Sequence, residues 1–122
     1  MQNKPGSFTL DSKAQISYYG EREAASVSEQ LAHLLRSATG FELETNEGNQ
    51  GDLRLLIDTT GTWHHEEYRL NISRRFVELR SETPEGLFRG IQTLRQLFPP
   101  MVESDTLVDD FDWSLPCLSI SD

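Results

Sequence analysis

The segment over residues 83–100 constrains the fold of this chain more than any other. Thr83-Pro84-Glu85 is typical of a helix start: a hydroxyl that can cap the first turn, a proline at the first helical position and an acid beside it. Pro99-Pro100 ends the helix, because proline lacks the amide hydrogen that a helix interior needs. Its apolar residues cover roughly 180° of the helix surface, more than one sheet needs to cover. We therefore expect a helix sandwiched between its own sheet and a second partner.

The apolar face of this helix supplies most of the residues that we predict to pack in the core and against another domain. Trp113 joins them, because it is flanked by apolar residues and its large ring favours packing over sugar stacking. An apolar face left uncovered can drive association, so we also expect possible self-association of the isolated domain. The predicted packing residues are Leu87, Phe88, Ile91, Leu94, Leu97, Phe98 and Trp113.

The hydrophobic period divides the remaining chain into strands and one more helix. Residues 22–38 carry apolar side chains at helical spacing, and Gly40 is placed to end that helix in a left-handed conformation. The other apolar runs indicate strands at residues 8–10, 16–19, 41–45, 53–57, 68–72, 77–80 and 113–120. This order predicts the α+β class: a mostly antiparallel sheet with two helices packed on one face, and one parallel pairing around the first helix.

We expect the chain to divide near residue 100. Residues 1–100 form the α+β domain, and residues 101–122 form an acidic connector followed by a strand. No basic residue follows Arg95, so the connector carries much of the acidity of the chain. The chain stops two residues after this last strand-like segment with no further element, which indicates that it was cut from a longer protein.

Charge and composition argue against several classes of protein. The formal net charge is −9, from 20 acids against 11 bases, whereas nucleic-acid binding needs clustered Lys and Arg. No stretch approaches the roughly 20 apolar residues that span a bilayer, so we expect no membrane span. A single cysteine, Cys117, allows no internal disulfide and no cysteine-based zinc site.

The sequence contains no convincing catalytic or metal-binding constellation. His64 and His65 are adjacent, and neighbours on a strand point to opposite faces, so both reach one ion only where a loop bends. The carboxylate pairs, Glu66-Glu67 and Asp109-Asp110, do not follow a convincing buried strand, and loop acids are usually solvated. We therefore expect neither metal nor cofactor. Trp63 lies in a polar loop, where sugar stacking and packing remain open alternatives.

The second half of the chain resembles a known domain. Residues 67–73 read Glu-Tyr-Arg-Leu-Asn-Ile-Ser, and residues 78–97 contain the run Thr-Pro-Glu-Gly-Leu-Phe-Arg-Gly-Ile-Gln-Thr-Leu-Arg-Gln-Leu. This resembles the N-terminal, non-catalytic domain of β-N-acetylhexosaminidases of glycoside hydrolase family 20. There, an E-x-Y-x-L-x-[IV] strand precedes a second strand and then T-x-x-G-L-F-x-G-x-Q-T-L-x-Q-L. The resemblance covers nearly the whole chain and is most specific over residues 67–97.

The resemblance implies an accessory domain whose helices lie between its sheet and a (β/α)8 catalytic barrel of the same parent chain. The parent removes terminal N-acetylglucosamine or N-acetylgalactosamine with retention; the substrate's acetamido group is the nucleophile and an Asp-Glu pair in the barrel assists. This chain has no Asp-Glu dipeptide and stops at Asp122, before the sugar-binding arginine. We expect it to be inactive alone. Its compartment is open from the residues; family enzymes are commonly exported, which implies a secreted or periplasmic parent.

Two alternatives remain beside the accessory-domain interpretation. The first is a stand-alone module that binds carbohydrate or protein, supported by Trp63 and by the apolar face of the second helix. The second is a small metal-dependent enzyme that uses His64, His65 and Glu67.

Overall fold

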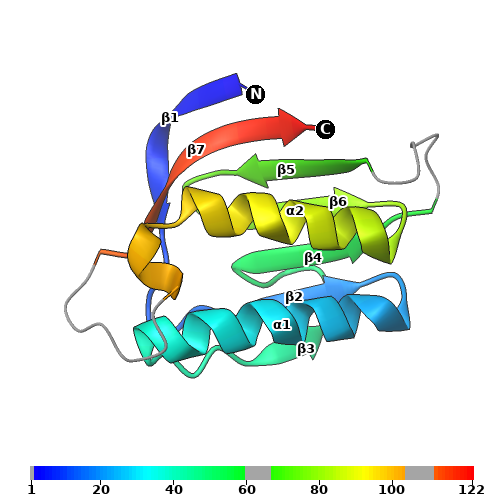
Figure 1. The fold of residues 1–122 in the computed structure, drawn as a ribbon, viewed down its shortest axis with the longest axis horizontal. Coiled ribbons are helices and arrows are strands. Elements are labelled where there is room, and N and C mark those ends of the chain that lie inside the picture. Colours follow the sequence, from blue (N-terminus) through cyan, green and yellow to red (C-terminus); the bar gives the residue numbers. More distant parts are fainter. Residues whose placement is uncertain (1, 60–66, 104–111) are drawn as a thin grey trace.

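The computed structural model describes residues 2–59, 67–103 and 112–122. Within these ranges the chain forms a seven-stranded sheet, two α-helices that cover one face of it, and a short 3-10 helix (Figure 1). In chain order the elements are β1 (Gln2–Thr9), β2 (Ile16–Tyr19), α1 (Arg22–Thr39), β3 (Thr45–Glu47), β4 (Leu53–Ile57), β5 (Tyr68–Ile72), β6 (Val77–Ser81), α2 (Pro84–Leu97), η1 (Pro100–Glu103) and β7 (Ser114–Ser121).

The sheet is mixed rather than mostly antiparallel. Its strand order is β1-β7-β5-β6-β4-β2-β3. Neighbours pair antiparallel from β1 to β6, whereas the β6/β4, β4/β2 and β2/β3 pairs are parallel. The α+β class with two helices on one face is therefore confirmed, but the single parallel pairing predicted from the sequence was too few. Hydrophobic alternation identifies a strand and does not encode which neighbour it joins or in which direction.

The main local signals identify the right elements. Helix α1 ends at Gly40, which has a φ of 74°, the left-handed conformation that its position predicted. At the start of α2 the Thr83 hydroxyl accepts a 3.1 Å hydrogen bond from the Gly86 amide. The strands predicted at residues 68–72 and 77–80 are β5 and β6, which pair antiparallel. The residues at the ends of these helices therefore determine where the helices begin and end.

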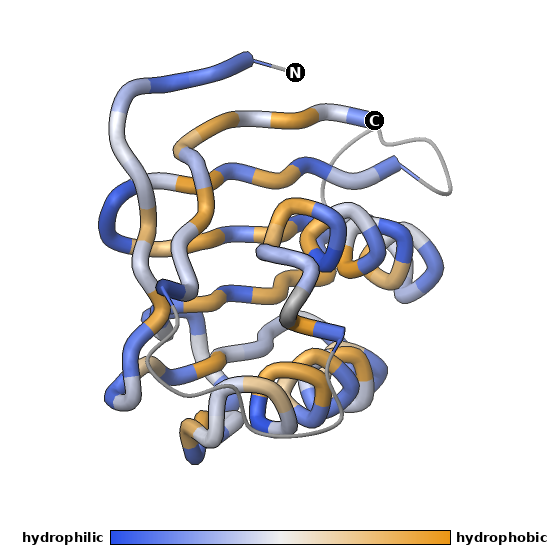
Figure 2. Tube along the Cα trace, turned by 60° about the vertical axis from the view of Figure 1, so that its left-hand side comes forward, coloured by the Kyte–Doolittle hydropathy of each residue, from blue (hydrophilic) through white to orange (hydrophobic). Residues whose placement is uncertain are grey.

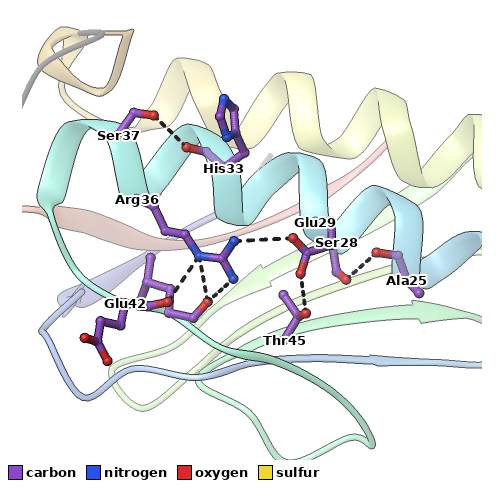
Figure 3. Close-up of polar contacts among 9 residues, drawn as sticks. Ala25, Ser28, Glu29, His33, Arg36, Ser37, Glu42 and Thr45 are labelled. Carbon is purple, nitrogen blue, oxygen red and sulfur yellow. Dashed lines mark hydrogen bonds and ion pairs between the residues drawn. The ribbon is translucent and has the colours of Figure 1, made fainter.

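The strand predicted at residues 41–45 is wrong. Residues 40–44 form no strand, and β3 begins only at Thr45. Leu43 is buried with a φ of 30°, and Phe41 also packs against the core, so their alternation reflects a loop folded onto the core. Arg36 of α1 donates hydrogen bonds to the carbonyl oxygens of Glu42 and Leu43, which have no neighbouring strand as partner (Figure 3).

The core fills the space between the sheet and the two helices. Apolar stretches recur along the strands and along both helices in Figure 2. Trp113, which precedes β7, and Phe98, which caps α2, are both buried in this layer. The last strand therefore belongs to the same hydrophobic core as the elements before residue 100. No helix in the described ranges is long and apolar enough to cross a membrane.

Candidate docking surface

Two glycines set α2 directly against the sheet. A Cβ atom on Gly86 would lie 2.7 Å from the Glu67 carbonyl oxygen and would clash with the Ser81 hydroxyl. A Cβ atom on Gly90, one helical turn later, would lie 2.8 Å from Cδ2 of Leu79. Real Cβ atoms do not approach other atoms this closely, so a side chain at Gly90 would push Leu79 aside, and one at Gly86 would meet backbone. The glycines of the sequence motif therefore have a packing role.

Most of the predicted packing residues lie in the core of this domain. Five of them are buried beneath α2 or between the helices and the sheet: Leu87, Ile91, Leu94, Phe98 and Trp113. Their side chains are covered by the domain itself and are not available to a second domain. Leu97 is partly buried, and Phe88 is 43% exposed. Any contact with a partner through these residues thus centres on Phe88.

Phe88 lines a groove between the first turns of the two helices. Both helices begin at the same end of the molecule (Figure 1). The groove encloses about 470 Å³ and is lined by Glu23, Ser26, Val27, Pro84, Glu85, Phe88 and Arg89. The contribution of α1 was not predicted, because an apolar stripe shows that a helix is buried but not which helix lies beside it. The groove offers an aromatic and aliphatic floor with charged groups at its rim.

The charged rim is held by contacts to the sheet. The Arg89 guanidinium forms a 3.4 Å ion pair with the Asp122 carboxylate and lies over the Tyr68 ring at 5.9 Å. The Tyr68 hydroxyl in turn shares a 2.5 Å hydrogen bond with the Thr93 hydroxyl, one turn farther along α2. These contacts join α2 to β5 and to the last residue of the chain. They fix the helix from which Phe88 projects.

The opposite face of the sheet carries charged and polar pairs around an exposed aromatic residue, Tyr19. Arg80 pairs with Glu78 at 2.6 Å and with Asp58 at 3.7 Å, and Lys4 donates to Asn71 at 2.8 Å. Charges of this kind remain hydrated at a protein surface and suit an exposed face. The helix face, with its exposed phenylalanine and its groove, is therefore better suited to burial against a partner.

A carboxyl group with a shifted pKa lies on α1, outside the residues that line the groove. The Thr45 hydroxyl donates a 2.6 Å hydrogen bond to Glu29, and Arg36 lies 3.3 Å from the same carboxylate (Figure 3). The Thr45 bond, and secondarily the Arg36 charge, hold the pKa of Glu29 below its usual range. Glu29 joins α1 to β3, which is a structural role.

Several residues considered for chemistry lie outside the described residues: Trp63, His64, His65, Glu66, Asp109 and Asp110. Glu67 is described, and its carboxylate lies 4.0 Å from the Arg69 guanidinium. Cys117 is buried. Within the described ranges, no three His, Cys, Asp or Glu side chains gather where they could hold a metal ion.

Comparison with known proteins shows similarity over most or all of this chain. The model of glycosyl hydrolase family 20, domain 2, matches residues 1–122. A beta-hexosaminidase of Porphyromonas gingivalis is 31% identical over 105 residues, which cover 84% of this chain and 13% of that protein.

Solved structures agree with this match. A mutant Streptomyces plicatus beta-hexosaminidase in complex with its product GlcNAc aligns with a TM-score of 0.92 and 34% identity, over 99% of this chain and 24% of that one. An exo beta-N-acetylglucosaminidase of Vibrio harveyi shares the fold, with a TM-score of 0.76 and 22% identity over 99% of this chain and 17% of that one. The chain thus spans a quarter or less of the proteins that it resembles.

Proposed function

The chain belongs to glycosyl hydrolase family 20, domain 2, and from this premise we propose that its helix face packs against the catalytic barrel of a longer β-N-acetylhexosaminidase chain. The domain is an accessory part of such an enzyme. In this proposal the parent hydrolyses terminal N-acetylglucosamine or N-acetylgalactosamine residues; two of the similar proteins are named a beta-hexosaminidase and an exo beta-N-acetylglucosaminidase. In this proposal the described residues of the helix layer supply a supporting surface for the barrel.

The exposure of Phe88 is the observation that carries this proposal. Phe88 is 43% exposed, while Leu87 and Ile91, its apolar neighbours on the helix, are buried. The family motif has phenylalanine at this position, and the fold of this domain does not require the ring to be inside. Burial of apolar area contributes about 25 cal/mol per Å², so covering the ring and the groove beside it would stabilise an interface.

The remainder of the helix layer suits the same role. Pro84 and Val27 extend the apolar floor of the groove from Phe88 toward α1. Glu23, Glu85 and Arg89 place two acids and one base at its rim, where polar partners can pair without being fully desolvated. Such a surface has the anatomy of an interface between domains: an apolar centre and a polar border.

Comparing this chain with a longer hexosaminidase chain that includes the barrel tests the proposal. We expect the 122-residue chain alone to leave a chromogenic N-acetyl-β-glucosaminide intact, and the chain with its barrel to hydrolyse it. Introducing Phe88→Asp into the longer protein should lower its unfolding temperature, because a charge would be buried at the interface. Tyr19→Asp, on the opposite face of the sheet, is the matched control and should have little effect. Hydrolysis by the 122-residue chain alone would overturn the accessory role.

A further inference from the structure

The outer face of the sheet carries a hollow that the docking role does not use. Tyr19 of β2, Leu56 of β4 and Arg80 of β6 are cross-strand neighbours, since Tyr19 pairs with Leu56 and Leu56 with Arg80. Residues of successive strands in register share one face, here the face turned away from the helices. Beside this row lies a hollow of about 370 Å³, lined by Tyr19, Gly20, Asn49, Leu56, Ile57, Asp58, Thr59 and Arg80.

The aromatic ring in this hollow is unusually accessible. Tyr19 is 54% exposed, whereas the neighbouring Tyr18 is packed against the core on the other side of the sheet. Leu56 provides an apolar side chain directly beside it. The hollow therefore combines a flat aromatic face with an aliphatic floor.

Polar groups beside the ring are held in place by the sheet. The Arg80 guanidinium lies between two carboxylates, 2.6 Å from Glu78 and 3.7 Å from Asp58. The Asp58 amide donates a 2.7 Å hydrogen bond to the Ser81 carbonyl oxygen, which continues the pairing of β4 with β6. Asp58 places a carboxylate at the edge of the hollow, beside Arg80. Asn49, in the loop between β3 and β4, adds an amide donor and acceptor.

We infer that this hollow is a sugar-binding subsite for one or two pyranose residues of a glycan chain. A pyranose presents a C–H face that packs on an aromatic ring, and a rim of hydroxyl groups that both donate and accept hydrogen bonds. Tyr19 matches the face, and Asp58, Asn49 and Arg80 match the rim. The volume lies within the range of small-ligand sites, about 300–1,000 Å³.

A neutral ligand fits this site better than an anion. The chain carries a net charge of −9, and the one guanidinium in the hollow is already paired with carboxylates. The site also lies on the face of the sheet opposite Phe88, so a glycan and a barrel would not compete for the same surface. A subsite of this kind would hold a glycan beside the parent enzyme and raise its local concentration.

The experiment is a titration of the ¹⁵N-labelled chain, followed by amide chemical shifts. Two sugars serve as probes. The first is the tetramer of N-acetylglucosamine, a choice that rests on the proposed function. The second is cellotetraose, which lacks the acetamido groups. We expect saturable shifts at Tyr19, Gly20, Asp58 and Thr59, with a Kd on the order of millimolar. Tyr19→Ala should weaken binding tenfold or more. Phe88→Ala, which removes an exposed ring from the opposite face, should leave the Kd unchanged.

The outcomes separate this inference from the proposed function. No saturable shift with either sugar, or an unchanged Kd in Tyr19→Ala, would overturn the subsite. If cellotetraose binds at Tyr19 and the N-acetylglucosamine tetramer does not, the subsite is supported. The expected preference for acetamido sugars, which comes from the proposed function, is then wrong. Asn49→Ala, a loop variant that leaves the sheet intact, is a second check and should also weaken binding. The docking of the helix face is measured separately at Phe88.

Discussion

Gly90 of α2 lies so close to Leu79 of β6 that a Cβ atom would come within 2.8 Å of Cδ2 of Leu79. The Leu79 side chain is fully buried and has little room to move. This contact brings the helix to its place on the sheet and positions the rest of α2, including Phe88.

We expect Gly90→Ala to destabilise the chain by about 1–3 kcal/mol, although alanine is the better helix former by about 1 kcal/mol. Gly86→Ala should cost more, because its Cβ would meet the backbone oxygen of Glu67, which cannot rotate away. Urea unfolding measures both free energies. Gln96→Ala, at an exposed position of the same helix, is the control and should change stability little. Equal stability of Gly86→Ala and the native chain would contradict the close packing.

Removing the Arg36 side chain should loosen the loop between α1 and β3. Its Nε and Nη2 atoms donate to the carbonyl oxygens of Glu42 and Leu43 at 3.1 and 2.7 Å. Arg36→Met would leave both oxygens without this donor, at a cost of about 1–3 kcal/mol. Faster amide exchange at Thr45 should accompany the loss of stability. Arg75→Met, at an exposed position of the β5–β6 turn, should have neither effect.

The Tyr68 and Thr93 hydroxyls should show a measurable coupling. They are 2.5 Å apart and join β5 to α2, and Tyr68 is 3% exposed. Tyr68→Phe and Thr93→Val each remove one partner, and the double variant removes both. A double-mutant cycle on unfolding free energies should give a coupling of about 1 kcal/mol. Strict additivity would show that this bond does not hold α2 to the sheet.

The free energy of unfolding should depend on pH through the ionisation of Glu29. Its pKa is lowered in the folded chain from the ordinary value of 4.5, so its ionised form is favoured by folding. The resulting stabilisation is present above pH 4.5 and is lost as the pH falls through the folded pKa. The advantage of the native chain over Glu29→Gln should therefore shrink between neutral and acidic pH in urea unfolding. A difference that stays constant over this range would contradict the role of the Thr45 bond.

Sequence reasoning succeeded where the determinants are local. The bounds of α2 follow from Thr83, Pro84 and the prolines after Leu97, and Gly40 marks the end of α1. It failed where a side chain takes the place of a strand partner. Phe41 and Leu43 alternate like a strand, yet the carbonyl oxygens of Glu42 and Leu43 accept hydrogen bonds from Arg36.

The docking surface was predicted as a helix face but not in detail. The wide apolar arc of α2 does not distinguish Phe98, which is buried, from Phe88, which is exposed, since that depends on where α1 and the sheet lie. The sequence gives a weaker indication of the hollow on the outer face of the sheet than of the helix face. Two adjacent tyrosines in one strand must point to opposite faces, so one of them had to leave the core.

The most direct test of the docking surface is the accessibility of position 88 with and without the rest of the parent protein. A cysteine introduced as Phe88→Cys should react readily with a water-soluble maleimide in the 122-residue chain. In the longer hexosaminidase chain it should be protected at least tenfold, whereas Tyr19→Cys should react at similar rates in both. The native chain has one cysteine, Cys117, which is buried. The rate at which the native chain reacts with maleimide therefore serves as the background. Equal reactivity of Phe88→Cys in the short and long proteins would contradict the account.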